Sequence, residues 1–119
     1  MDDQAKERLV PRRPLLPAFI LLLLREAPSH GYEMCERLRD VGFAFPDPSP
    51  VYRELRTLEK FGLVRSLLSP HESGPVPKVY ELTADGKEAL AYSAAEASSV
   101  AGLLAQFEQR YRTGSHHRH

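Results

Sequence analysis

The chain has 119 residues, which is the size of one domain and enough to bury a hydrophobic core. Hydrophobic residues make up 42% of the chain and charged residues 27%, which excludes a wholly disordered protein. Lys plus Arg and Asp plus Glu number 16 each, so a nucleic-acid-binding surface would need a local concentration of cations. The single cysteine, Cys35, excludes an internal disulfide and a multi-cysteine zinc site, and fits a reducing, cytoplasmic location.

The N-terminal part of the sequence predicts an arm followed by an apolar helix. Residues 1–13 are polar and charged and predict a flexible arm. The apolar run Pro14–Leu24 follows two arginines, so a secretory signal is one interpretation. Arg25 and Glu26 close the run with charge, no small-residue cleavage site follows, and about ten apolar residues are too few for the roughly 20 that span a bilayer. We therefore expect a buried core helix over Pro14–Glu26 and no membrane partner.

A second helix is predicted over His30–Asp40, with Ser29 as its N-cap and Gly42 as its C-cap. Its apolar stripe consists of Met34, Cys35, Leu38 and Val41. Because Cys35 lies on this stripe, a packed thiol is favoured over a redox sensor. The linker Phe43–Pro48 follows, and Phe43 and Phe45 are expected to anchor it on the core rather than to line an effector pocket.

The third predicted helix spans residues 49–61, with Ser49 as N-cap, Pro50 at the first position and Gly62 just past the end in a left-handed conformation. Two strand-like segments follow at Leu63–Ser69 and Val76–Leu82, separated by an irregular loop.

After the second strand, in which Tyr80 and Leu82 are expected to point to the core, Thr83 caps a last helix that runs to about Arg112. Gly86 and Gly102 are expected to be weak points in it. The order of elements predicts a mainly α fold with a small β-hairpin wing, which is a winged helix-turn-helix. We assign residues 14–82 to this DNA-binding domain, 83–112 to a C-terminal dimerisation helix and 113–119 to a disordered tail.

A helical wheel of residues 49–61 separates the charges from the apolar side, which consists of Val51, Leu55 and Leu58. Glu54 and Glu59 lie at the flanks, and the outward arc has three cations and no acid. The arc consists of Ser49, Tyr52, Arg53, Arg56, Thr57 and Lys60. Such an arc is either a solvated helix face or a surface for double-stranded DNA, because Lys and Arg neutralise phosphates and Arg can also pair with guanine. The preceding helix and the following hairpin favour DNA.

Four stretches of the chain match one family in order and spacing, over about residues 15–90. They are Phe19–Leu24, Ser29–Met34, Pro50–Val64 and Lys78–Leu90. With these stretches the chain resembles the PadR family of transcriptional regulators. The resemblance implies a homodimeric winged-helix repressor, often relieved by a small-molecule effector, with a single long C-terminal helix. Within the family, the chain is similar to proteins labelled polyhydroxybutyrate-responsive repressors in two short stretches of sequence, Gly31-Tyr32-Glu33 and Pro48–Arg53.

The wing departs from the family pattern. The family usually carries several basic residues before the second strand, whereas this chain keeps Lys78, with His71 nearby. The resemblance therefore supports a DNA contact from Lys78 less strongly than one from the recognition helix. Gly31, which lacks a side chain, is expected to let the second helix approach the first closely.

The last helix predicts a partner surface, because apolar residues recur along it mostly three and four apart, as in a coiled coil. A helix of nearly thirty residues is roughly 40 Å long and exceeds what a small core covers. Its far end either folds back on the chain's own core or pairs two copies, and the length favours a homodimer. The expected seam consists of Ala97, Val100, Leu103, Leu104, Phe107 and Tyr111. Two recognition helices would then meet successive turns of DNA, about 34 Å apart.

The remaining signals are weaker. An effector pocket is expected where the first and last helices meet, at Phe19, Leu23, Leu90 and Tyr92. No cofactor or metal is expected: the histidines at 116, 117 and 119 suit a frayed tail better than a metal site. No catalytic constellation or phosphate-binding glycine loop stands out, so an enzyme is not expected. The alternative to a DNA-binding regulator is a winged-helix module that binds other proteins.

Overall fold

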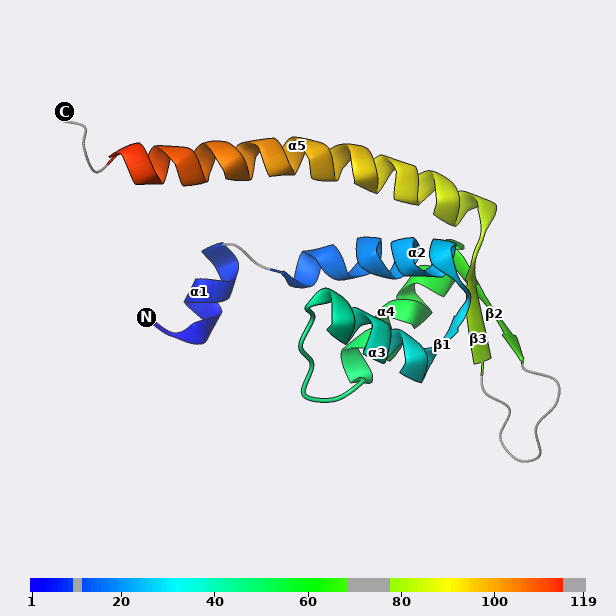
Figure 1. Cartoon of the computed structure of the whole chain (residues 1–119). Coiled ribbons are helices and arrows are strands. Elements are labelled where there is room, and N and C mark those ends of the chain that lie inside the picture. Colours follow the sequence, from blue (N-terminus) through cyan, green and yellow to red (C-terminus); the bar gives the residue numbers. More distant parts are fainter. Residues whose placement is uncertain (10–11, 69–77, 115–119) are drawn as a thin grey trace.

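The computed structural model (Figure 1) describes residues 1–9, 12–68 and 78–114. In chain order the elements are α1 (Asp3–Leu9), the 3-10 helix η1 (Arg13–Leu15), α2 (Leu16–Glu26), β1 (Ser29–His30), α3 (Gly31–Val41), α4 (Ser49–Lys60), β2 (Val64–Leu68), β3 (Lys78–Leu82) and α5 (Ala84–Gly114). Helices α2, α3 and α4 form a cluster that the sheet closes at one end, and α5 runs from the sheet back along α2 (Figure 1). The predicted mainly α fold with a β-hairpin wing is confirmed.

Helix α2 is the central helix of the core. Its side chains at Leu16, Ile20, Leu21, Leu23 and Leu24 are buried, which confirms the prediction of a core helix. No helix in the described ranges is long and apolar enough to cross a membrane.

Helix α3 packs on α2 with most of its predicted stripe, since Met34, Cys35 and Leu38 are buried whereas Val41 is largely exposed. Gly42 follows at φ 127°, in the role of C-cap that the sequence predicts. Burial raises the pKa of the Cys35 thiol, as expected for a packed cysteine. The linker phenylalanines Phe43 and Phe45 pack against the core.

The antiparallel sheet has the order β1-β3-β2. Strands β2 and β3 pair from Val64↔Leu82 to Leu68↔Lys78, and Arg65 forms a cross-strand ion pair with Glu81. Tyr80 is buried and Leu82 packs against the core, as the alternation predicts. The predicted strand ends at residues 69, 76 and 77 and the loop between them lie outside the described residues.

The prediction that Ser29 caps the second helix is wrong, because Ser29 lies in strand β1. Ser29 pairs with Tyr80 in the sheet, and its hydroxyl donates to Glu33 Oε1 at 3.1 Å. The cap position belongs to His30, whose N–H donates to the same carboxylate at 3.4 Å. Pairing with β3 extends the backbone at Ser29 and His30, so the helix begins one residue later than predicted.

The first 13 residues contain more regular structure than the predicted arm. Helix α1 is capped by Asp2, whose Oδ1 accepts a hydrogen bond from Ala5 N at 2.7 Å. The α1 side chains that the structure describes are exposed. This local cap accounts for a helix that the charged composition alone did not indicate.

Two helix starts differ in how well they were predicted. Ser49 is the first residue of α4 rather than its N-cap: Pro48 takes the cap position, and Asp47 Oδ1 accepts the Ser49 N–H at 2.8 Å. The start of α5 is as predicted, because Thr83 Oγ1 accepts the N–H of Gly86 at 3.0 Å. The predicted end of α4 is also confirmed, since Gly62 has a left-handed φ of 77°.

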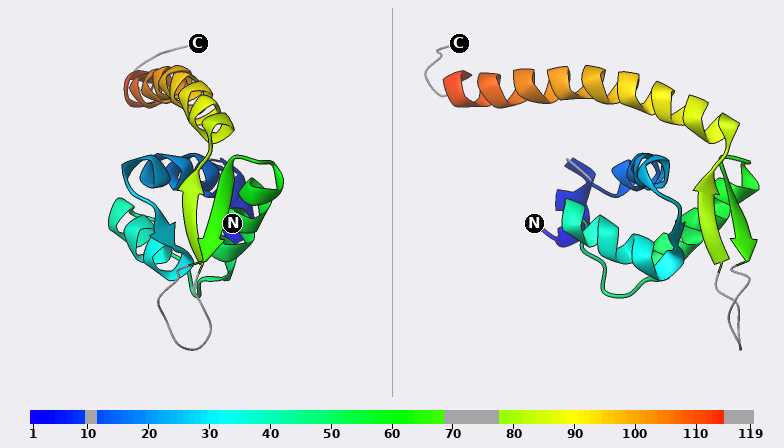
Figure 2. Two further views of the ribbon diagram at one scale, coloured as in Figure 1. Left: turned by 90° about the vertical axis from the view of Figure 1, so that its right-hand side faces the viewer. Right: turned by 45° about the vertical axis from the view of Figure 1, so that its right-hand side comes forward.

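The far half of helix α5 does not pack on the core of its own chain. Gly86 and Leu90 are buried, but every residue from Ala94 to Gly114 is exposed, and Figure 2 shows this far half extending past the other elements. Gly86 is not the weak point that the sequence suggested: a β-carbon there would lie 3.1 Å from the carbonyl carbon of Leu63. The helix ends two residues beyond Arg112, and residues 115–119 of the predicted tail lie outside the described residues.

Candidate nucleic-acid interface

Helix α4 presents a basic face to solvent. Val51, Leu55 and Leu58 are buried on its inner side. On its outer side Tyr52 is half-buried, and the other members of the predicted arc are exposed: Ser49, Arg53, Arg56, Thr57 and Lys60. Arg53, Arg56 and Lys60 form no ion pair with any residue in the described ranges. Three cations on one helix face are thus available to a negatively charged partner.

Two carboxylates near this helix, those of Glu59 and Asp47, accept hydrogen bonds from serines and form no ion pair with the cations of α4 among the described residues. Glu59 reaches the base of the wing, where its Oε2 accepts hydrogen bonds from Ser66 N at 3.1 Å and from Ser66 Oγ at 2.6 Å. Glu54 is half-buried, and the loss of water around it raises its pKa. At the helix start, hydrogen bonds from Ser49 lower the pKa of Asp47, with a smaller contribution from Arg53. The positive face is therefore kept by specific placement of the acids.

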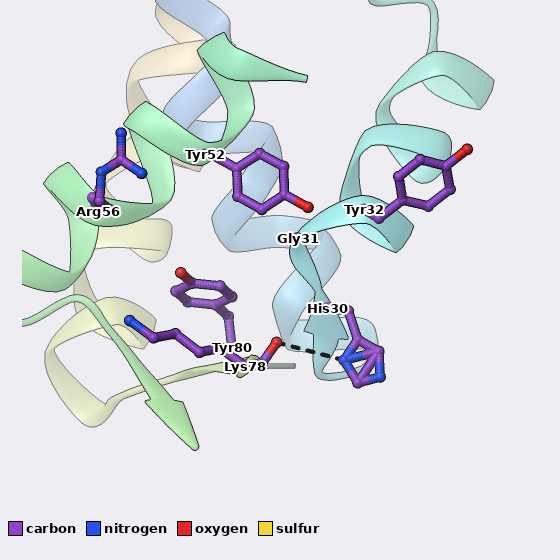
Figure 3. Close-up of a pocket in the computed structure, with 7 residues that line it drawn as sticks. All are labelled: His30, Gly31, Tyr32, Tyr52, Arg56, Lys78 and Tyr80. Atoms are coloured by element: carbon purple, nitrogen blue, oxygen red, sulfur yellow. Dashed lines mark hydrogen bonds between the residues drawn. The ribbon is translucent and has the colours of Figure 1, made fainter. Parts of the chain in front are cut away.

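A shallow pocket of about 350 Å³ opens beside this face (Figure 3). It brings together three residues predicted from the sequence, Tyr52, Arg56 and Lys78, which come from α4 and from the start of β3. The complete lining is His30, Gly31, Tyr32, Tyr52, Arg56, Lys78 and Tyr80. Tyr32 and Tyr80 were not predicted for this site, because residues distant in the sequence come together here through the packing of α3 on α4 and the β1–β3 pairing.

Gly31 has a different packing role from the one predicted. A β-carbon at Gly31 would collide with the ring of Tyr52, on α4, whereas the sequence suggested a close approach to the first helix. The missing side chain therefore makes room for a residue of the basic face. Lys78 is exposed at the base of the wing, and the wing residues 69–77, His71 among them, lie outside the described residues.

The predicted dimer seam lies on the exposed half of α5. Its apolar members are all solvent-accessible in the single chain, with 65% of Phe107 exposed. A groove of about 390 Å³ runs along this half, lined by Leu103, Gln106, Phe107, Arg110 and Tyr111.

The residues of the predicted effector pocket are spread over two environments. Leu23 and Leu90 are buried core residues, and Phe19 packs edge-to-face on Phe43 with ring centroids 5.4 Å apart. Tyr92 lies on the outside of α5, with 69% of its surface exposed. The contact between α2 and α5 brings Phe19, Leu23 and Leu90 to one region of the fold.

Comparison with known proteins identifies the family. The model of the transcriptional regulator PadR-like family matches residues 20–92, more than half of the chain. The chain belongs to the PadR family. No curated protein sequence matches this chain.

Solved structures of PadR regulators share the fold. A PadR family regulator from Clostridium difficile is 26% identical, with a TM-score of 0.69 over 78% of this chain and 97% of that one. A putative transcriptional regulator from Thermoplasma acidophilum is 28% identical, with a TM-score of 0.72 over 82% of this chain and 93% of that one. Bacillus subtilis PadR, solved in complex with operator DNA, is 27% identical, with a TM-score of 0.60 over 67% of this chain and 47% of that one. The chain is thus a PadR-family transcriptional regulator with a winged-helix DNA-binding fold, and its family and fold are not those of an enzyme.

Proposed function

We propose that the chain is a cytoplasmic, sequence-specific repressor that binds operator DNA as a homodimer and responds to a small-molecule effector. The observation that carries the DNA-binding part is the face of α4: Arg53, Arg56 and Lys60 are exposed together, unpaired among the described residues, and clear of the carboxylates of Glu54 and Glu59. A neutral protein that keeps such a face has concentrated its cations where an anionic groove can meet them.

In this proposal α4 lies in the major groove. Arg53 and Arg56 are placed to pair with guanine or phosphate, and Lys60, near the C-terminal end of the helix, to neutralise a phosphate. Ser49, Tyr52 and Thr57 supply hydroxyl groups for bases or backbone. Lys78 lies at the base of the wing and lines the same pocket as Tyr52 and Arg56, so it adds a cation beside α4.

The dimer would form through the exposed half of α5. A helix that leaves Val100, Leu103, Leu104, Phe107 and Tyr111 in water presents a continuous apolar stripe, and burying such a stripe against a second copy is the usual solution. A symmetric dimer would also hold two copies of α4 at a fixed separation, as two half-sites on DNA require.

An effector would act through the junction between α5 and the wing. Thr83, between β3 and α5, ties the start of α5 to the segment that joins α4 to β2, since its hydroxyl donates to Gly62 O at 2.6 Å and accepts from Gly86 N. A small molecule bound near Phe19, Leu23, Leu90 and Tyr92 would change the angle of α5 and with it the separation of the two α4 helices. Such a ligand shifts DNA binding only if its affinity differs between the two arrangements.

The experiment is a selection of binding sites from randomised duplex DNA with the purified full-length chain, followed by sequencing. The proposal predicts an enriched palindrome whose half-sites lie one helical turn, about 10 base pairs, apart. Failure to enrich any sequence, with a folded and dimeric protein, would contradict it and favour a protein-binding module.

A further inference from the structure

The pocket in Figure 3 lies beside the basic face of α4, where four elements converge: β1, α3, α4 and β3. Gly31 begins α3, Tyr52 and Arg56 project from α4, and Lys78 and Tyr80 come from β3. His30 closes one side, where its Nδ1 lies 3.4 Å from the backbone oxygen of Lys78. The β1–β3 pairing holds His30 beside Lys78 and Tyr80, so the sheet contributes to the shape of the pocket.

Tyr80 carries the strongest indication of a ligand. The residue is 4% exposed, and its hydroxyl makes no hydrogen bond to any residue that the structure describes. No side-chain oxygen or nitrogen in the described ranges is both sealed from water and without a partner, so this hydroxyl must reach solvent through the pocket. In Figure 3 it points to the side of the pocket where Arg56 lies. A buried tyrosine normally gives its O–H a partner, so this one is a free donor directed at the pocket.

The charges around the hydroxyl favour an anion. Arg56 and Lys78 line the pocket and form no ion pair with described residues, and no acidic side chain is among the described residues of the lining. Burial raises the pKa of Tyr80, the nearby carboxylate of Glu59 raises it further, and Arg56 opposes this with a smaller effect. That carboxylate is already occupied by two hydrogen bonds from Ser66, and the raised pKa keeps Tyr80 protonated as a donor.

We propose that this pocket binds one phosphate group of the DNA backbone, next to the bases that α4 contacts. Arg56 and Lys78 supply the positive charge, and the hydroxyls of Tyr80 and Tyr52 donate to the phosphate oxygens. Gly31 is a positioning residue, because only a residue without a side chain leaves the ring of Tyr52 in place. This inference rests on the proposed function, and it assigns Arg56 to phosphate binding while leaving Arg53 and Lys60 to the rest of the groove.

A DNA phosphate fits the pocket better than a free phosphorylated small molecule. The pocket is open and shallow, and it shares Tyr52 and Arg56 with the outward arc of α4. A duplex lying on that arc would carry its backbone across the pocket. A free phosphomonoester has the same oxyanion chemistry, so the experiment must separate the two sources.

The test combines Tyr80→Phe with operator duplexes in which one phosphate at a time is replaced by an uncharged methylphosphonate. Tyr80→Phe keeps the buried ring and removes the hydroxyl alone. We expect it to weaken operator binding by about tenfold, the loss of a hydrogen bond to a charged group. At one position in each half-site, the methylphosphonate should weaken DNA binding by the wild-type chain. On that same duplex, Tyr80→Phe should bind as tightly as the wild type, because the hydroxyl has lost its partner. A structural role of Tyr80 would give the same penalty at every position.

Three outcomes decide between the explanations. If the wild-type chain binds no DNA, the proposed function fails. If it binds, but Tyr80→Phe binds equally well or couples to no single phosphate, the pocket assignment alone is overturned. If phenyl phosphate binds the DNA-free chain and Tyr80→Phe abolishes that binding without weakening the operator complex, the pocket is a small-molecule site instead. Lys87→Gln, an exposed change on α5, is the control for charge and folding and should bind the operator like the wild type.

Discussion

The ring of Tyr52 fills the space that a side chain at Gly31 would need, at the edge of the basic face. A β-carbon at Gly31 would stand 2.9 Å from Cζ of Tyr52 and closer still to Cε1. The start of α3 and the middle of α4 are therefore in contact through a ring that has no room to move inward. This contact couples the packing of α3 against α4 to the position of a side chain on the basic face of α4.

We expect Gly31→Ala to destabilise the chain by about 1–3 kcal/mol, because the added methyl group must displace the Tyr52 ring or the start of α3. Urea unfolding would measure the loss. Combining it with Tyr52→Ala should recover part of the stability by removing the ring. Gly102→Ala is the matched control: a β-carbon there meets nothing within 4 Å, and Ala in a helix interior should add about 0.5–1 kcal/mol. Equal effects at the two glycines would refute the collision.

Charged substitutions in the predicted dimer seam should change the oligomeric state. Leu104→Glu with Phe107→Glu should give monomers in analytical ultracentrifugation, since four charges would have to be buried at a two-fold interface. DNA affinity should fall steeply because a single half-site binds weakly. The control is Ala95→Glu with Ser98→Glu, which adds the same charge on the opposite side of α5. A dimer that survives the first pair of changes would remove this stripe as the interface.

Glu54 predicts a pH dependence of stability. Because burial raises its pKa in the folded chain, the folded state binds a proton more tightly than the unfolded one, and Glu54 destabilises the fold once the pH exceeds both pKa values. Glu54→Gln should therefore raise the melting temperature at pH 7.5 and have little effect near pH 3, where the carboxyl is largely protonated in both states. The exposed change Glu88→Gln should show no such gain. A melting temperature that Glu54→Gln lowers at pH 7.5 would contradict the account.

Much of this fold could be predicted because its signals are local. The apolar face of α4, the left-handed Gly62 and the Thr83 cap each depend on residues close in the sequence, and the structure has all three. The cationic arc follows from the same helical period, so the prediction placed Arg53 and Arg56 on the outer side.

The features that were missed depend on contacts between distant residues. The two-residue strand β1 has no alternation of its own and exists because Ser29 meets Tyr80 across about fifty positions. The contact between Gly31 and Tyr52 joins α3 to α4, and the pocket around Tyr80 needs the β1–β3 pairing, so neither could be predicted from one helix at a time. A local pattern could show that Gly31 needs space, but not which side chain fills it.

The most direct test of the DNA-binding claim is the affinity of the selected operator for Arg53→Gln with Lys60→Gln, by fluorescence anisotropy at several salt concentrations. These two cations lie on the arc but do not line the Tyr80 pocket, so the result is independent of the phosphate proposal. We predict a loss of about tenfold to several hundredfold and a shallower dependence of affinity on salt, while Lys87→Gln binds as the wild type. Unchanged affinity and salt dependence in the folded, dimeric double variant would contradict the docking of α4 on DNA.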